Sequence, residues 1–363
     1  MVGAGVFRKH NCRVTEFSVC GMRALAIENE CLRVTLLLDK GADIIEFRDK
    51  RTDVDVMWAA PAGLRAPLSA MPTAYNPDGN YLDFYEGGWQ TLFPTIGDPA
   101  EINGAKLGIH GEACLLPWDW RLIEETDERA SVELSCRMLR TPFLMTKTLT
   151  LRRGKRALWI DEVAENVGGV KLPLMWGHHP ALGGPFIDGE LLIDVPARRG
   201  TTFPRSFHPD FPASKPFDWP KITDTLDVSR LPAIEGKWAG LCNATDLGEG
   251  WYAVTNPKLG LGFALAFDRA MFPNVWLWMV YEGMDHYPWY GQARCVALEP
   301  YSSVPDNLEG SIRAGTALEL SAGERRKTSL CAMLYGAKGR VTRADMAGDV
   351  ILREESEHAE NPK

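Results

Sequence analysis

Hydrophobic and polar residues alternate with a period of two along much of the chain, and this pattern limits the fold more than any other feature. Residues 32–38 (LRVTLLL) and 130–136 (ASVELSC) show it. Successive side chains of a β-strand point to opposite faces, so the alternation predicts strands. Polar turns at 126–129 and 152–155 divide the segment 118–165, which predicts antiparallel hairpins.

Amphipathic helical patterns are scarce, and the 363 residues include 34 Gly and 24 Pro, as expected for many short strands joined by turns. The sequence therefore predicts an all-β sandwich, with residues 1–340 as a single domain. Residues 341–363 are predicted to form a charged C-terminal tail that is helical or frayed. Residues 59–88 and 200–235 are rich in proline and aromatic residues, and they are predicted to be long ordered loops of the kind that often carry function.

Charge and cysteine content narrow the class of protein. The formal net charge is -8, and no stripe of basic residues stands out, so nucleic acid is not an expected partner. Eight cysteines without a CxxC pair predict reduced, mostly buried thiols and a cytoplasmic location. No apolar run approaches the ~20 residues of a membrane span. We expect a monomer or homodimer that binds a small molecule.

Three stretches combine titratable groups with turn residues and tryptophan. They contain His110, His179 and Glu299, and they are GGWQTLFPTIGD (87–98) running on to GIHGEACLLPW (108–118), LMWGHHPALGGPF (174–186) and ALEPYSSVPDN (297–307). Taken alone, His110 could be a turn residue bonded to backbone, and Glu299 could be a turn carboxylate before Pro300. Only a fold that brings distant strands together would make the three residues one site.

The pair His178-His179 suggests a metal at first sight, but adjacent residues of a strand point to opposite faces. Only one of the two can therefore enter a given pocket. Zinc spacings such as HxxxH and CxxC are missing near the pair as well. We expect no metal.

Together the three stretches resemble the aldose 1-epimerases, or galactose mutarotases, and the related hexose-6-phosphate epimerases. GGWQTLFPTIGD followed by HGEACLLPW resembles two paired segments of that family. GHHPALGGPF lies at the place of its His-x-x-aromatic strand, and ALEPYSSVPDN is similar to its C-terminal leucine-glutamate segment. The resemblance spans about residues 35 to 335. It implies a β-supersandwich of large, mainly antiparallel sheets and a reaction that needs no cofactor.

The resemblance also implies roles for single residues. Glu299 matches the general base that takes the proton of the C1 hydroxyl, His179 matches the general acid that protonates the ring oxygen, and His110 matches a second histidine near that oxygen. Histidine titrates near neutral pH, and a carboxylate does so when burial raises its pKa. The residues expected to bind substrate are Trp89, Gln90, His178, Trp278 and, in the middle of the chain, Asp246 or Asp268.

Two departures from the family bear on the substrate. The phosphosugar enzymes have arginines where this chain has Glu86 and Cys114. A carboxylate would repel a phosphate, so an unphosphorylated aldose or sugar derivative is expected unless Arg65, Arg198 or Arg199 substitutes. The resulting hypothesis is an aldose 1-epimerase. The alternatives are a carbohydrate-binding or sensing protein on the same fold and, more remotely, a lyase or glycoside-processing enzyme.

Overall fold

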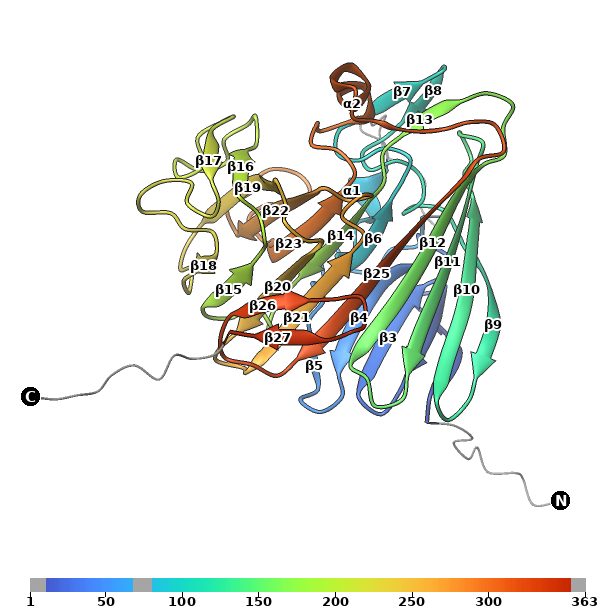
Figure 1. Cartoon of the computed structure of the whole chain (residues 1–363), viewed down its shortest axis with the longest axis horizontal. Coiled ribbons are helices and arrows are strands. Elements are labelled where there is room, and N and C mark those ends of the chain that lie inside the picture. Colours follow the sequence, from blue (N-terminus) through green and yellow to red (C-terminus); the bar gives the residue numbers. More distant parts are fainter. Residues whose placement is uncertain (1–10, 68–79, 354–363) are drawn as a thin grey trace, which may run out of the picture.

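Two large antiparallel sheets dominate the computed structural model, which describes residues 11–67 and 80–353 (Figure 1). The first sheet has the strand order β1-β2-β3-β4-β6-β14-β23-β22-β19-β16-β17, with β5 beside β4. Its strands are β1 (Arg13–Val19), β2 (Met22–Glu28), β3 (Leu32–Leu37), β4 (Asp43–Asp49), β5 (Val54–Asp55), β6 (Trp89–Leu92), β14 (Gly177–Leu182), β16 (Arg199–Thr202), β17 (Pro216–Asp218), β19 (Trp238–Thr245), β22 (Asn274–Tyr281) and β23 (Arg294–Tyr301).

The second sheet has the order β18-β15-β20-β21-β25-β12-β11-β10-β9. Its strands are β9 (Asp119–Glu125), β10 (Arg129–Arg137), β11 (Phe143–Arg152), β12 (Ala157–Asn166), β15 (Leu191–Asp194), β18 (Arg230–Leu231), β20 (Trp251–Asn256), β21 (Leu261–Phe267) and β25 (Arg325–Tyr335). The hairpins β9–β10 and β11–β12 are antiparallel, as their polar turns predicted. The all-β prediction is confirmed.

Small elements complete the described part of the chain. They are the strand pairs β7 (Ala100–Ile102) with β8 (Ala105–Leu107), β13 (Leu172–Leu174) with β24 (Leu318–Leu320), and β26 (Val341–Ala344) with β27 (Val350–Leu352), and the helices α1 (Tyr81–Phe84) and α2 (Leu308–Ala314). No helix within 11–67 or 80–353 is long and apolar enough to cross a membrane.

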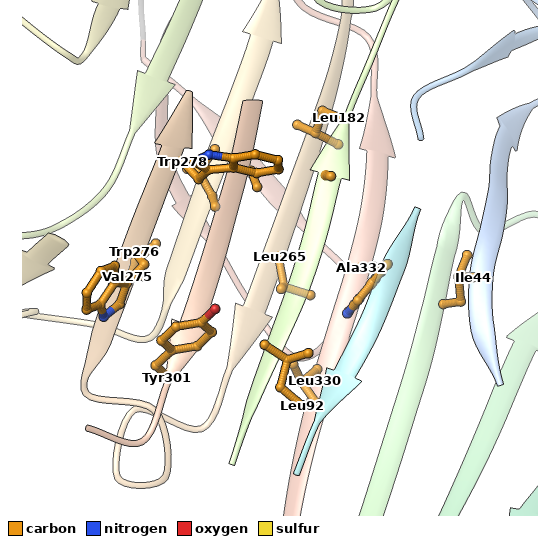
Figure 2. Close-up of a cluster of buried hydrophobic side chains, with 14 of the residues drawn as sticks. Ile44, Leu92, Leu182, Leu265, Val275, Trp276, Trp278, Tyr301, Leu330 and Ala332 are labelled. Atoms are coloured by element: carbon orange, nitrogen blue, oxygen red, sulfur yellow. The ribbon is translucent and has the colours of Figure 1, made fainter. Parts of the chain in front are cut away.

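The core lies between the two sheets and is continuous from Cys12 to Leu334. Figure 2 shows part of it, where Leu265 and Leu330 of the second sheet lie near Leu92 of the first. Each large aliphatic side chain buried in this way contributes about 1.5–3 kcal/mol to folding. The eight cysteines are free, and six of them are buried.

The C-terminal tail differs from its prediction. Residues 341–344 and 350–352 form a β-hairpin rather than a helix or a frayed end. Val341 and Ala344 are buried against Trp251 and neighbouring side chains of the second sheet, and Trp159 Nε1 donates a hydrogen bond to the carbonyl of Met346 at 2.9 Å. The apolar residues between the charges therefore hold the hairpin on the sheet. Residues 354–363 lie outside the described part.

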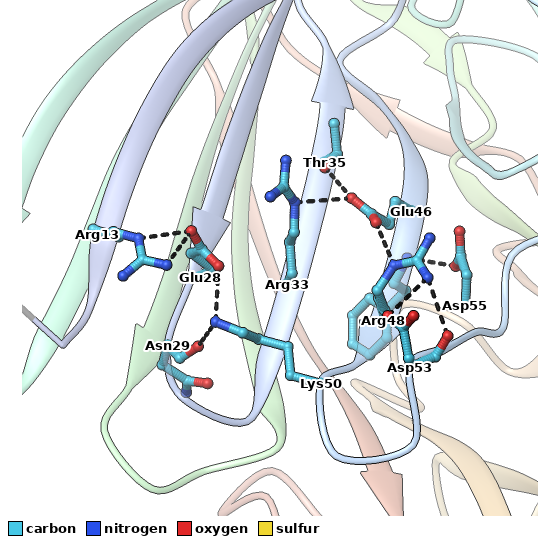
Figure 3. Close-up of polar contacts among 11 residues, drawn as sticks. Arg13, Glu28, Asn29, Arg33, Thr35, Glu46, Arg48, Lys50, Asp53 and Asp55 are labelled. Atoms are coloured by element: carbon cyan, nitrogen blue, oxygen red, sulfur yellow. Dashed lines mark hydrogen bonds and ion pairs between the residues drawn. The ribbon is translucent and has the colours of Figure 1, made fainter. Parts of the chain in front are cut away.

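Cross-strand pairs of opposite charge occupy part of the surface of β1 to β5. Arg13 lies opposite Glu28 in the register and forms an ion pair with it at 2.6 Å, and Lys50 reaches the other oxygen of Glu28 at 2.9 Å (Figure 3). Glu46 of β4 pairs across the strands with Arg33 of β3, and it also contacts Arg48 of its own strand. Such pairs add a few tenths of a kcal/mol, up to about 1 kcal/mol each, to strand pairing.

Candidate active site

The register of the first sheet brings two of the predicted residues together. β14 pairs with β23 so that Gly177 lies opposite Tyr301 and Ala181 opposite Ala297. This register places His179 opposite Glu299. Two residues 120 positions apart in the sequence therefore lie side by side on one face of adjacent strands, as the sequence hypothesis required.

A cavity of about 220 Å³ lies over this part of the sheet. Four strands supply its floor: β14 carries His179, β23 carries Glu299 and Tyr301, β22 carries Trp276 and Trp278, and β19 carries Leu241. Loops and α1 supply its walls, and the aromatic residues that line it are Tyr81, Tyr85, Phe203, Phe207, Trp276, Trp278, Trp289 and Tyr301. Flat apolar rings beside a few titratable groups suit a small molecule that has both apolar and polar faces.

His179 and Glu299 form the polar centre of the cavity. His179 Nε2 lies 3.4 Å from Glu299 Oε1, and both side chains are almost completely buried. Burial raises the pKa of Glu299 to about 8 and lowers the pKa of His179 to about 4. Both shifts favour the neutral forms, because a charge is poorly solvated in this position. At neutral pH the pair therefore holds an acidic proton on Glu299 and an open acceptor on His179.

A tyrosine contacts each member of the pair. The hydroxyl of Tyr85 lies 3.2 Å from His179 Nδ1. The hydroxyl of Tyr301 donates to Glu299 Oε2. Burial, followed by nearby ionisable groups, raises the pKa of both tyrosines well above the ordinary value. Both hydroxyls therefore keep their protons at neutral pH.

His110 lies beside the pair. Its ring centroid is 5.5 Å from that of His179, and its Nδ1 accepts a hydrogen bond from the backbone N–H of Gly97 at 3.0 Å. Burial, together with the neighbouring His179, lowers the pKa of His110 well below its ordinary value. A neutral ring that accepts at Nδ1 carries its hydrogen on Nε2. His110 is thus a fixed hydrogen-bond donor at the cavity.

His178 does not belong to this site. It is 1% exposed and lies on the opposite face of β14, where its Nε2 is 3.1 Å from Glu162 Oε2 on β12 and its Nδ1 accepts from Trp89 Nε1 at 3.2 Å. Lys147 also reaches Glu162, at 3.5 Å. Burial raises the pKa of Glu162, but His178 and Lys147 outweigh burial and lower it to about 2. The predicted substrate contacts of His178 and Trp89 are therefore replaced by core contacts.

Gln90 also differs from its prediction. It lies opposite His179 in the register of β6 and β14, but it is fully buried and does not line the cavity. Its amide nitrogen donates to the carbonyl of Gly87 and lies 3.4 Å from Glu86 Oε1. Gln90 thus holds the segment before β6 in place, and any effect on a ligand would be indirect.

Glu86 and Cys114, which suggested an unphosphorylated substrate, do not reach the cavity. Lys40 Nζ contacts Asp43 Oδ2 at 2.6 Å, Glu86 Oε2 at 2.7 Å and the carbonyl of Cys114 at 3.2 Å. The ionisable side chains of this cluster are buried. The two positions therefore carry no direct information about a phosphate, because Glu86 pairs with Lys40 and the thiol of Cys114 lies 3.9 Å from the carbonyl oxygen of His110.

The remaining polar candidates lie elsewhere. Asp246 and Asp268 are exposed and do not line the cavity; Asp246 lies 3.9 Å from Arg198, and Asp268 accepts from the backbone N–H of Ala270. Arg65, Arg198 and Arg199 do not line it either. Trp278 does, and its ring centroid is 5.6 Å from that of His179. Its predicted role in substrate binding stays a prediction.

Several cavity residues were missed by the sequence reasoning. Tyr301 could have been found, because it lies two residues after Glu299 and strand periodicity places both on one face. Trp276 likewise lies two residues from Trp278 on β22, so both side chains are on one face of the strand. Its Nε1 is buried and has no hydrogen-bond partner in the described structure. Arg205 and His286 line the cavity from exposed loop positions, and no local signal marks them.

No group of three or more His, Cys, Asp or Glu residues within 11–67 and 80–353 is placed to hold a metal ion. His110, His179 and Glu299 converge, but the Nδ1 atoms of both histidines already have hydrogen-bond partners. The chemistry that this arrangement can support is proton transfer between a carboxyl group, an imidazole and a bound molecule.

Comparisons with known proteins agree with the fold. A family model described as "Domain of unknown function (DUF4432)" matches residues 19–333. A search of curated protein sequences finds no match. Solved structures do match: a protein from Klebsiella pneumoniae provisionally named an aldose 1-epimerase is 13% identical, with a TM-score of 0.70, covering 90% of this chain and 84% of its own.

Two further solved structures are similar. A galactose mutarotase-like protein from Clostridium acetobutylicum is 14% identical, with a TM-score of 0.62, covering 90% of this chain and 99% of its own. Another from Lactobacillus casei is 17% identical, with a TM-score of 0.57, covering 86% and 100%. At such identities the likeness shows the fold, which is the galactose mutarotase-like β-sandwich expected from the resemblance.

Proposed function

The chain belongs to the family described as a domain of unknown function, DUF4432, and we propose that it is an aldose 1-epimerase that interconverts the α and β anomers of a small sugar. The pair of His179 Nε2 and Glu299 Oε1, 3.4 Å apart in an aromatic cavity, carries this proposal. Opening an aldose ring removes a proton from O1 and delivers one to O5, and both oxygens are bonded to C1. An acid and a base this close together suit that demand.

The protonation states of Glu299 and His179 decide which residue gives a proton to the sugar and which accepts one. With its pKa raised to about 8 by burial, Glu299 carries a proton at neutral pH, and His179, with its pKa lowered to about 4, does not. In the ligand-free site Glu299 is thus the acid and His179 the base, the reverse of the roles that the resemblance implies. Ring closure runs each transfer backwards, so both residues act as acid and as base in one turnover.

The reaction then proceeds as follows. His179 Nε2 accepts the O1 proton while Glu299 gives its proton to O5 and the C1–O5 bond breaks. The open aldehyde rotates about C1–C2, and O5 attacks the other face of C1. Glu299 recovers its proton from O5, and O1 recovers the proton held by His179. No electron or group is gained or lost, so the site returns to its starting state without a cofactor.

The other cavity residues fit this role. The Nε2–H of His110 can donate to the ring oxygen or to O1, where negative charge develops as the C1–O5 bond breaks. The unpaired Nε1–H of Trp276 offers a further donor for a hydroxyl. Trp278 and Trp289 present apolar rings to the C–H faces of a sugar.

The substrate panel should be broader than the sequence suggested, since Glu86 and Cys114 do not line the cavity. Arg205 and His286 line it and could meet an anionic substituent, whereas Asp98 and Asp306 line it as well. A substrate panel should therefore contain neutral aldoses, uronic acids and sugar phosphates.

The decisive experiment is exchange NMR or polarimetry on freshly dissolved single anomers of that panel. We expect at least one sugar to equilibrate faster than in buffer, and Glu299→Gln to lower that rate by at least about 10²-fold, as removal of a general acid does. Glu133→Gln, which changes a partly exposed carboxylate of β10 in the second sheet, is the matched control and should keep the rate.

Two results would contradict the proposal. One is that no sugar of the panel equilibrates faster than in buffer. The other is that Glu299→Gln retains the full rate. A sugar that raises the thermal unfolding midpoint without faster equilibration would instead identify a carbohydrate-binding protein.

A further inference from the structure

Two buried tyrosines continue the hydrogen-bonded chain on either side of the His179–Glu299 pair. In order, the Tyr85 hydroxyl lies 3.2 Å from His179 Nδ1, His179 Nε2 lies 3.4 Å from Glu299 Oε1, and the Tyr301 hydroxyl donates to Glu299 Oε2. The four residues are 2 to 5% exposed. Because hydrogens in such a chain must be shared without conflict, its geometry limits the forms that His179 can take.

When Glu299 is protonated and Tyr301 donates to Oε2, as it does in the structure, only one arrangement satisfies every contact. Tyr301 occupies Oε2 as a donor, so the carboxyl hydrogen sits on Oε1 and is donated to His179 Nε2. A neutral imidazole that accepts at Nε2 carries its hydrogen on Nδ1. That hydrogen must then be accepted by the oxygen of Tyr85.

When Glu299 is ionised, the arrangement inverts. Oε1 now accepts, so His179 must carry its hydrogen on Nε2, and the bare Nδ1 must receive a hydrogen from Tyr85. The hydroxyl of Tyr85 is able to do both, because it can donate and accept. A residue that could only donate or only accept would satisfy one of the two forms and leave the other with an unpaired buried group.

We propose that Tyr85 is a positioning residue that stabilises both tautomers of His179, so that the ring nitrogen facing Glu299 changes from acceptor to donor when the site loses a proton. The hydrogens balance in this change. The Glu299 proton moves to Nε2, the Nδ1 hydrogen moves to the Tyr85 oxygen, and the original hydroxyl hydrogen of Tyr85 leaves to water. The inference rests on the proposed function, since it assigns a role within that site.

The groups around the pair do not offer His179 another partner in the described structure. The titratable residues that act on the pair or on Tyr85 are His110 from the loop after β8, Cys295 of β23, Tyr252 of β20, Glu86 before β6 and Tyr81 of α1. Only Tyr85 lies within hydrogen-bond distance of Nδ1. Because burial raises the pKa of Glu299 to about 8, the tautomer change should fall in an accessible pH range.

Nitrogen-15 NMR of the full chain can test the proposal without any substrate. The protein has seven histidines, and His179→Gln assigns the resonances of interest. From about pH 6 to about pH 10, Nδ1 of His179 should change from a protonated to an unprotonated shift while Nε2 changes in the opposite sense. In Tyr85→Phe this reciprocal change should be lost or moved by about one pH unit or more, since one form loses its partner.

Tyr335→Phe is the matched control, because it also removes a buried tyrosine hydroxyl bond, to Thr255 at 2.7 Å in the second sheet. It should leave the His179 resonances unchanged. The proposal is wrong if wild-type His179 keeps one tautomer over the whole range, or if Tyr85→Phe behaves as wild type does.

Kinetics give an independent measure. On an equilibrating sugar, Tyr85→Phe should lower kcat about tenfold and change KM by less than about twofold, because it alters the proton state of His179 rather than a substrate contact. An unchanged kcat would contradict the proposal. If no sugar equilibrates at all, the proposed function fails, but the tautomer measurement still decides the role of Tyr85.

Discussion

Lys40 is a buried ammonium group that holds two carboxylates behind the cavity wall. It contacts Asp43 at 2.6 Å and Glu86 at 2.7 Å, and all three residues are no more than 3% exposed. Burial alone would lower the pKa of Lys40, but Asp43 and Glu86 outweigh it and raise that pKa above the ordinary value. Burial also raises the pKa of Asp43. The cluster is therefore stable only as a unit.

Removal of the lysine charge should be costly. We expect Lys40→Met to lower the free energy of unfolding by about 3–5 kcal/mol, because two buried carboxyl groups lose their common partner. Lys171→Met is the control, since Lys171 pairs with Glu319 at 2.8 Å with both side chains more than half exposed, and it should cost at most about 1 kcal/mol. Urea unfolding at one pH measures both, and equal losses in the two variants would contradict this reading of the cluster.

Strand periodicity predicted which neighbours share a face, but not which face is packed. The sequence implied that His178 and His179 point in opposite directions, and they do. That His178 faces the core follows from Glu162 and Lys147 on the other sheet, which no local pattern around the histidines reveals. For the same reason, the sequence did not show that Glu86 and the backbone carbonyl of Cys114 contact Lys40 instead of lining the cavity.

Two loops that face each other position His110. The backbone N–H of Gly97 donates to His110 Nδ1, and the backbone N–H of His110 donates to the carbonyl of Gly97, both at 3.0 Å. Gly97 has φ +69°, and a Cβ there would lie 2.1 Å from the carbonyl oxygen of Asp306. The glycine thus lets three segments of chain meet at the cavity.

A methyl group at Gly97 should disturb both stability and activity. Gly97→Ala and Gly104→Ala both place alanine at positive φ, which costs about 1–2 kcal/mol. Only Gly97→Ala also collides with the backbone of Asp306, since a Cβ at Gly104 meets nothing within 4 Å. We expect it to cost at least about 1 kcal/mol more and to raise KM. Thermal unfolding and sugar equilibration test this, and equal behaviour of the two variants would show that the contact is unimportant.

At the element scale, the strongly alternating strands and their turns were predictable, but the tail was not. Its charges suggested a helix or a frayed end, whereas Val341 and Ala344 pack on the second sheet. A two-stranded hairpin is marginal alone, so its existence depends on a surface that the tail sequence does not contain. The long loop predicted over 200–235 contains only short strands and supplies Phe203, Arg205 and Phe207 to the cavity.

At the scale of the whole molecule, the order of the strands brings distant residues together in one site. Residues near 85, 97, 110, 179, 205, 276–301 and 305 meet at one cavity because the first sheet orders its strands as β6-β14-β23-β22-β19. The strand order depends on which strands pair with one another, and the period of the hydrophobic pattern in one sequence does not reveal those pairings. The resemblance to a known family supplied that information for His110, His179 and Glu299, but not for residues outside its motifs.

Burial of the site also affects the stability of the whole protein. The pKa of Glu299 rises from 4.5 to about 8 on folding, so between these values the folded protein holds a proton that the unfolded chain releases, and stability falls as pH rises. The pKa of His179 falls from 6.5 to about 4, so between those values the unfolded chain holds the extra proton, and stability rises with pH. The two effects oppose each other below pH 6.5, and above it only that of Glu299 remains.

We therefore expect Glu299→Gln to remove a fall in stability between pH 6.5 and about 8. That fall should amount to about 2 kcal/mol, because each pH unit over which one proton is retained is worth about 1.4 kcal/mol. Urea unfolding of wild type and variant at several pH values in this range isolates the effect, since Asp43 and other shifted groups are common to both. Glu133→Gln, at a partly exposed carboxylate far from the cavity, should follow the wild-type curve. Parallel curves for wild type and Glu299→Gln would mean that Glu299 is already ionised at neutral pH, and His179 would then be the acid of the pair, as the resemblance implies.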